Sequence, residues 1–137
     1  MDIAIMDIND LKEHEEVDLD HLKKLKNKIR KERLLKKPIA VDKNTKIIID
    51  GHARFNSLKQ LGYSKIPVFI IDYNSPEILV KSWRKNGKIT KDDVLSAGLN
   101  GKKLPPKTSK NIVKVGNKFK HISELERIVN IPLEKLR

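Results

Sequence analysis

The feature that most constrains the fold is an apolar strand that runs into a glycine and then directly into a helix. Residues 47–50 are Ile-Ile-Ile-Asp, Gly51 follows, and apolar residues recur at helical spacing over 55–61. Such a glycine turn leaves free backbone N–H groups and the positive end of the helix dipole facing outward, and His52 and Arg54 add donors suited to a phosphate. The order of parts predicts an anion site, although Asp-Gly is also a common turn dipeptide that occurs by chance.

The composition indicates one globular domain of modest size. The chain has 137 residues, of which 38% are hydrophobic and 35% charged, and this suits a single core. It contains no cysteine, which excludes disulfides, thiolate metal sites, cysteine nucleophiles and thiol redox chemistry. The sequence begins without a signal-peptide pattern and has no apolar run long enough to cross a bilayer, so we expect a cytoplasmic protein with no membrane partner.

The net charge of +12 favours a polyanionic partner, and nucleic acid is the first class to consider. Against this, the lysines are spread along the chain, including the long stretch from Lys23 to Lys135, and only five aromatic residues besides Trp83 are present to stack bases. A lysine-rich surface also fits a thermophile, in which charge networks supplement the core. The charge alone leaves both interpretations open.

Hydrophobic periodicity predicts a chain of mixed strands and helices. The predicted strands span 3–8, 38–42, 46–49, 66–73 and 78–83, with 38–49 forming a β-hairpin and 66–73 at the centre of the sheet. The first predicted helix runs from Asp18 or Asp20 to Leu35, and the second ends at a cap at Gly62. The third runs from Thr90, with Asp93 in a capping box, to just before Gly98, and the fourth spans 122–129. Residues 101–111 are predicted to form a basic loop, and Pro132 to open a final turn.

Several motifs together resemble the ParB/sulfiredoxin-like superfamily. They are His-Glu-Glu-Val at 14–17, Pro-Ile-Ala-Val-Asp at 38–42, Ile-Asp-Gly-His-Ala-Arg at 49–54 and Leu-Gly-Tyr-Ser-Lys-Ile-Pro-Val at 61–68. The resemblance narrows to the free L-serine kinases of that superfamily through Trp83, the helix start at 89–94, Pro-Pro-Lys-Thr-Ser-Lys at 105–110 and the segment 130–137.

This resemblance covers nearly the whole chain and implies an α/β (α+β) fold with a small mixed sheet flanked by helices. It implies a single ParB/sulfiredoxin-like kinase domain over 1–137. Within it, 1–110 would be the core with both phosphate loops, and 111–137 a C-terminal extension packed on that core.

Free L-serine kinases phosphorylate the amino acid itself, and the resemblance implies the same activity here. The phosphoryl donor would be ADP or ATP with Mg²⁺, and the product, O-phospho-L-serine, would feed cysteine biosynthesis. The implied partners are L-serine and an adenine nucleotide, for a monomer or small homo-oligomer.

The resemblance assigns the catalytic base to Glu15, with Glu16 as the near alternative. A serine hydroxyl is a poor nucleophile at neutral pH, so a positioned carboxylate must accept its proton as the bond to phosphorus forms. Catalytic roles are also implied for Asp50, beside the metal ion, and for His52. Without the resemblance, Glu15 would belong to a solvated acidic loop.

Two loops and one aromatic residue complete the implied site. The phosphate-binding and nucleotide-binding residues would be Gly51, His52, Ala53, Arg54, Lys107, Thr108 and Ser109. The serine-binding residues would be Glu15, Val17, Trp83, Thr108 and Lys110. As plain sequence, the second loop is a surface loop, and a lone tryptophan after an apolar strand is more often part of the core.

Two positions depart from the family pattern, because Ala53 and Asn111 stand where the family commonly has histidines. They are compatible with a different donor, a changed ligand or a fold without activity. The rival classes are a ParB-like DNA-binding protein or nuclease and a silent nucleotide-binding regulator. Nucleic acid is disfavoured because 111–137 is too short for a helical DNA-reading domain, and the lack of cysteine excludes a sulfiredoxin-type reductase.

Overall fold

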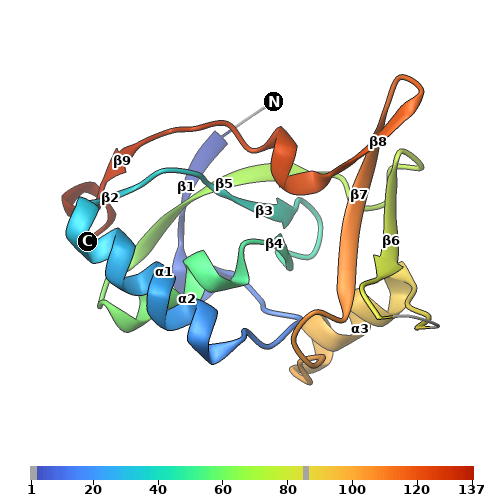
Figure 1. The fold of residues 1–137 in the computed structure, drawn as a ribbon, viewed down its shortest axis with the longest axis horizontal. Coiled ribbons are helices and arrows are strands. Elements are labelled where there is room, and N and C mark those ends of the chain that lie inside the picture. Colours follow the sequence, from blue (N-terminus) through green and yellow to red (C-terminus); the bar gives the residue numbers. More distant parts are fainter. Residues whose placement is uncertain (1–2, 85–86) are drawn as a thin grey trace.

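A four-stranded mixed sheet forms the centre of the computed structural model, which describes residues 3–84 and 87–137 (Figure 1). The strand order is β1-β5-β3-β4, with β1 antiparallel to β5, β5 parallel to β3, and β3 antiparallel to β4. The strands are β1 (Ile3–Asp7), β3 (Ile39–Asp42), β4 (Ile48–Asp50) and β5 (Lys65–Ile71). The predicted mixed sheet, the hairpin of β3 and β4, and the central position of β5 in the sheet are confirmed.

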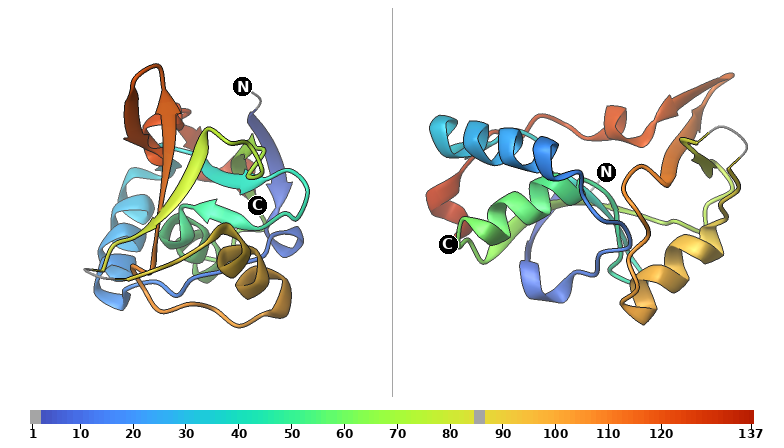
Figure 2. Two further views of the ribbon diagram at one scale, coloured as in Figure 1. Left: turned by 90° about the vertical axis from the view of Figure 1, so that its right-hand side faces the viewer. Right: turned by 60° about the horizontal axis from the view of Figure 1, so that its bottom comes forward.

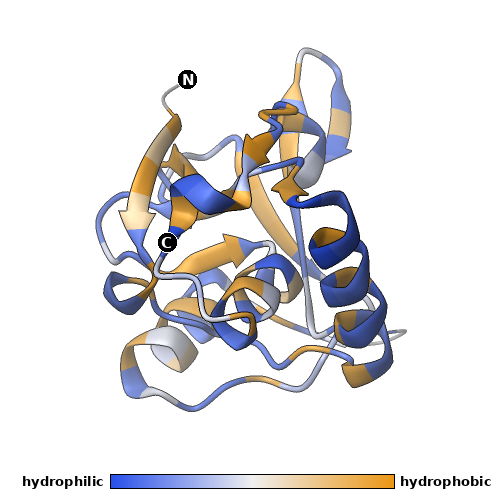
Figure 3. Ribbon diagram, turned by 90° about the vertical axis from the view of Figure 1, so that its left-hand side faces the viewer, coloured by the Kyte–Doolittle hydropathy of each residue, from blue (hydrophilic) through white to orange (hydrophobic). Residues whose placement is uncertain are grey.

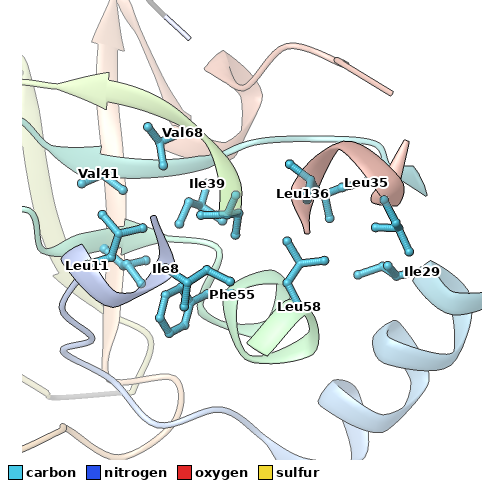
Figure 4. Close-up of a cluster of buried hydrophobic side chains, with 13 residues drawn as sticks. Ile8, Leu11, Ile29, Leu35, Ile39, Val41, Phe55, Leu58, Val68 and Leu136 are labelled. Carbon is cyan, nitrogen blue, oxygen red and sulfur yellow. The ribbon is translucent and has the colours of Figure 1, made fainter. Parts of the chain in front are cut away.

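Both faces of this sheet are covered. Alternate residues of a strand point to opposite faces, and in β3 Ile39 and Val41 pack with the helices α1 and α2, whereas Ala40 packs on the other face with α3 and β7. Figure 4 shows the first of these clusters, in which Phe55 and Leu58 of α2 lie against the sheet. Burial on both sides explains why β3 and β5 are almost continuous apolar runs.

Helix α1 (Leu19–Glu32) begins as predicted, because the Asp18 side chain accepts a hydrogen bond from the backbone N–H of Asp20. The predicted end at Leu35 is wrong. Arg33 adopts a left-handed conformation with φ of 58°, and the next two residues form β2 (Leu34–Leu35), which pairs with β9 (Ile131–Pro132). In Figure 3, α1 is the long, mostly hydrophilic helix on the right.

Helix α2 (His52–Gln60) follows the glycine turn, and α3 (Lys91–Asn100) begins with the predicted capping box of Thr90 and Asp93. The predicted end of α3 before Gly98 is wrong, because the helix continues to a left-handed cap at Gly101. Gly98 is needed for close packing, since a Cβ there would lie 2.7 Å from Ile47 Cδ1.

A second, antiparallel sheet consists of β6 (Ile78–Ser82), β7 (Ser109–Val115) and β8 (Lys118–His121), in the order β6-β7-β8. The sequence predicted only β6, and the end of the predicted loop over 101–111 is wrong, because β7 already begins at Ser109. The helix predicted over 122–129 is only a short 3₁₀ turn, η2 (Ile122–Leu125). After Pro132, the predicted final turn is the 3₁₀ helix η3 (Leu133–Leu136). Both η3 and the shorter 3₁₀ turn η1 (Ile8–Asp10) contribute side chains to the core. Within 3–84 and 87–137, no helix has both the length and the apolar character needed to span a bilayer.

Candidate functional site

The segment before α1, the start of α2 and the loop before β7 approach one another in the fold (Figure 2). Residues of all three line a cavity of about 870 Å³. Most of the predicted site residues line it: Glu15, Val17, Asp50, Gly51, His52, Ala53, Arg54, Trp83, Lys107 and Ser109. Two do not. The Thr108 hydroxyl donates to the Pro105 carbonyl at 2.6 Å, and the Lys110 ammonium lies 4.6 Å from the Trp83 ring centroid. The cavity thus brings together residues from both predicted loops.

The glycine turn has the geometry of an anion site. Gly51 has φ of 100°, and no side chain of the described residues caps the N-terminus of α2, so its first backbone N–H groups face outward with the positive end of the helix dipole. A Cβ at Gly51 would lie 2.5 Å from Ile39 Cγ2 and 3.0 Å from a guanidinium nitrogen of Arg54. Only glycine fits this position without strain.

Arg54 is held by two carboxyl groups, one of which the sequence analysis missed. Its guanidinium lies 3.1 Å from Asp50 Oδ2 and 2.9 Å from Glu126 Oε1. Burial raises the pKa of Glu126 to about 9, which Arg54 opposes and Asp50 reinforces. Glu126 Oε2 has no hydrogen-bond partner among the described residues. No local pattern marks Glu126, because its partners lie far away in the sequence.

Glu15 faces the second loop. Its Oε1 accepts hydrogen bonds from the Ser109 backbone N–H and hydroxyl, each at 2.8 Å. Burial raises the pKa of this carboxyl, and hydrogen bonds from the Ser109 backbone and side chain and from the backbone of Thr108 and Lys107 oppose the shift. Burial therefore makes Glu15 a stronger base than an exposed glutamate, as a proton acceptor requires.

Backbone pairing aligns this acidic segment with the second loop. The Leu104 N–H donates to the His14 carbonyl, and the Glu16 N–H donates to the Leu104 carbonyl, both at 2.8 Å. Glu13 adds an anchor, since its carboxylate accepts from Asn56 of α2 at 2.6 Å. The side chain of Glu16 is exposed, and no such bonds orient it among the described residues. This geometry favours Glu15 over Glu16 as the base.

Two buried histidines lie behind the site, and the role of the first was not predicted. The rings of His14 and His52 are 4.6 Å apart, and His52 Nε2 accepts from the His14 backbone N–H at 3.2 Å. Burial lowers the pKa of both, to about 4 for His14 and well below the usual value for His52. His52 is therefore neutral. Of the two donors that the sequence predicted for the glycine turn, Arg54 alone carries a positive charge.

Trp83 lies at the rim of the cavity, 51% exposed, and not in the core. Its ring centroid is 6.0 Å from that of His121. Asn111, where the family commonly has histidine, is buried: it accepts from the Tyr73 hydroxyl at 2.7 Å and donates to the Ile49 carbonyl at 3.2 Å.

A magnesium ion fits this site only in part. Among residues 3–84 and 87–137, no group of three or more His, Asp or Glu side chains is arranged to hold a metal. Magnesium in phosphoryl-transfer sites is commonly held by one or two carboxylates together with substrate phosphates and waters. Asp50 lines the cavity and meets that requirement, although its Oδ2 already accepts from Arg54.

No protein-family model matches the chain. In sequence, the chain is 37% identical over 84 residues to an ATP-dependent L-serine kinase of Staphylothermus marinus, which covers 58% of this chain and 33% of that protein. It is 40% identical over 75 residues to a ParB-like protein of Sulfolobus acidocaldarius, covering 55% of this chain and 37% of the relative. The chain thus spans about a third of the length of the curated relatives it matches.

In structure, the chain resembles a free serine kinase in complex with AMP, with a TM-score of 0.81 at 14% identity, covering 100% of this chain and 94% of the other. The fold is an α/β fold like that of this free serine kinase structure, and the glycine turn has the geometry of an anion site. By sequence, the chain is a relative of the L-serine kinases, and the predicted fold class and family resemblance are confirmed.

Proposed function

We propose that this domain phosphorylates free L-serine to O-phospho-L-serine, with an adenine nucleotide as donor. The observation that carries the proposal is the position of Glu15, a partly buried carboxyl that lines the same cavity as the glycine turn and Arg54. A volume of about 870 Å³ lies within the range of small-molecule sites and leaves room for a nucleotide beside serine. The names of the relatives support serine as acceptor and ATP as donor.

In the proposed reaction, Glu15 accepts the proton of the serine hydroxyl while the serine oxygen bonds to phosphorus and the bond from phosphorus to the nucleotide oxygen breaks. The first N–H groups of α2 and the Arg54 guanidinium would hold the transferring phosphoryl group and offset its charge. Lys107 would extend this positive surface from the second loop. Trp83 and Val17 line the part of the cavity where we expect serine to bind.

Asp50 would hold Mg²⁺, which would neutralise phosphate charge. We further propose that 1–137 act as one domain, because Glu126 of the C-terminal extension contacts Arg54 in the glycine turn at 2.9 Å. We place the reaction in the cytoplasm, where free serine and adenine nucleotides are both present, in a monomer or small homo-oligomer. The product would supply cysteine biosynthesis.

Phosphorus NMR of the purified protein with Mg²⁺ and L-serine, run separately with ADP and ATP, tests the proposal. We expect O-phosphoserine with at least one donor. Glu15→Gln should abolish turnover and leave nucleotide affinity largely intact, whereas Glu16→Gln, a matched control on the neighbouring residue, should retain turnover. If neither donor gave O-phosphoserine while the folded protein still bound nucleotide, the kinase proposal would be wrong.

A second candidate is a ParB-like nucleotide- or DNA-binding protein without kinase activity. It is favoured by the net charge of +12 and by the relative named as ParB-like. Such a protein would bind duplex DNA in a salt-sensitive manner, and Glu15→Gln would leave this binding unchanged. Absence of O-phosphoserine together with such binding would favour this candidate over the kinase.

A further inference from the structure

The hydroxyl of Ser109 lies between two possible acceptors. Its Oγ is 2.8 Å from Glu15 Oε1 and 3.0 Å from His14 Nε2. Ser109 is 8% exposed and His14 is fully buried, so water has little access to this group. A hydroxyl carries one hydrogen and can serve only one of the two acceptors at a time.

The ring of His14 is fixed in one tautomer by its other contact. Its Nδ1 lies 2.7 Å from the Ile48 carbonyl oxygen, and because a carbonyl only accepts, Nδ1 must carry the hydrogen. The ring is neutral near pH 7, since burial lowers its pKa to about 4. His14 Nε2 is therefore an acceptor, and within the described residues Ser109 Oγ is its only hydrogen-bond partner.

We propose that the Ser109 hydroxyl is a two-position donor whose orientation follows the protonation state of Glu15, with His14 as the second acceptor. When Glu15 is ionised, Ser109 donates to Glu15 Oε1. When Glu15 has taken the proton of the substrate hydroxyl, its own O–H donates to Ser109 Oγ, and Ser109 turns to donate to His14 Nε2. The proton stays on Glu15, so charge and hydrogen count balance.

Ser109 and His14 are then positioning residues for the proton acceptor, and this consequence for catalysis rests on the proposed kinase function. His14 Nε2 accepts the Ser109 hydroxyl hydrogen only when Glu15 is protonated. This hydrogen bond therefore stabilises protonated Glu15 and raises the pKa of its carboxyl. Burial raises the pKa of Glu15 in the same direction. Both effects make Glu15 a better base at neutral pH.

A double-mutant cycle isolates this link. His14→Asn retains a donor for the Ile48 carbonyl but removes the acceptor at Nε2. It should lower the pKa of Glu15 by about one unit, the equivalent of one hydrogen bond. In a Ser109→Ala background the same substitution should shift the pKa of Glu15 far less, because the hydroxyl that connects the two groups is gone. A direct effect of the His14 ring would appear equally in both backgrounds.

The other charged groups near this pair are unchanged throughout the cycle. The charged groups are Asp50 at the end of β4 and Lys103, which is paired with Glu13, and the neutral ring of His52 also contacts that of His14. Their contributions therefore cancel when the two His14→Asn shifts are compared.

Carboxyl ¹³C NMR titration of the full chain without substrates would measure the Glu15 pKa in all four proteins, with Glu15→Gln to assign the signal. Long-range ¹H–¹⁵N NMR of the wild type should find His14 with Nδ1 protonated and Nε2 bare. A His14 ring protonated at Nε2, or equal shifts in the two backgrounds, would overturn the proposal. His14→Phe replaces His14→Asn in the cycle if the latter does not fold. Since neither measurement depends on turnover, a protein that fulfils them but makes no O-phosphoserine would refute the kinase and leave this hydrogen-bond switch standing.

Discussion

Replacement of Gly51 by alanine tests whether the glycine turn is shaped by its contacts as well as by its backbone conformation. The left-handed conformation at φ 100° costs an L-residue about 1–2 kcal/mol. The new Cβ would also lie 2.5 Å from Ile39 Cγ2, and Ile39 is fully buried, so overpacking adds about 1–3 kcal/mol. We expect Gly51→Ala to lower the free energy of unfolding by about 2–5 kcal/mol.

Gly62→Ala is a matched control. Gly62 has a similar φ of 88°, but a Cβ there would meet no atom of residues 3–84 and 87–137 within 4 Å. It should lose only the conformational part, about 1–2 kcal/mol. Urea denaturation of the two variants gives both values on one scale.

Nucleotide binding separates the two variants further. In Gly51→Ala the added Cβ would lie 3.0 Å from the Arg54 guanidinium, so this side chain must move and titration calorimetry should report weaker nucleotide binding. Gly62→Ala should bind nucleotide like the wild type. Equal losses of stability in the two variants, or unimpaired nucleotide affinity in a folded Gly51→Ala, would refute the reasoning.

The remaining predictions concern the charged groups of the site. Arg54→Ala should weaken nucleotide binding and slow turnover together, because one guanidinium serves both steps; an effect on turnover alone, measured by calorimetry and steady-state kinetics, would contradict this. Glu126→Leu should reduce nucleotide affinity more than Glu126→Gln, which still offers an oxygen to Arg54; equal affinities would mean that Glu126 does not position Arg54. The contribution of His14 to the free energy of unfolding should fall as the pH drops from about 6.5 to 4, because His14, with its folded pKa lowered to about 4, binds a proton in the unfolded chain first. Glu126, with its folded pKa raised to about 9, has the opposite effect over much of this range and is common to both proteins, so chemical denaturation should find that the stability of wild type relative to His14→Asn falls by about 3 kcal/mol between these pH values; a constant difference would contradict this.

The parts of the fold with local signals were predictable from the sequence. The apolar run into Gly51, the capping box at Thr90 and the hairpin of β3 and β4 each depend on residues close together in the chain, and the structure has all three. The end of α3 was misplaced because a glycine commonly caps a helix, whereas Gly98 is required by the approach of Ile47. Tertiary packing overrode the local rule.

The candidate site was only partly predictable, because its key contacts join distant segments. The carboxyl of Glu15 meets Ser109 across 94 positions, and Arg54 meets Glu126 across 72. No periodicity or motif spacing carries such pairings, and Glu126 lies in a segment predicted to be an ordinary helix. The glycine turn had its own local pattern, and the resemblance supplied Glu15 and the second loop, but the contacts of His14 and Glu126 were visible only in three dimensions.

Asn111 is one of the two departures from the family pattern, and its contacts show what the asparagine does here. Its amide links the Tyr73 hydroxyl on one side to the Ile49 carbonyl of β4 on the other. Burial raises the pKa of Tyr73, so that hydroxyl stays protonated and remains a donor to the amide oxygen. The asparagine therefore fastens β7 to the strand that leads into the glycine turn. Because Glu15 takes its hydrogen bonds from residues 107–109 and not from position 111, the exchange of histidine for asparagine removes none of the groups that hold the proposed base.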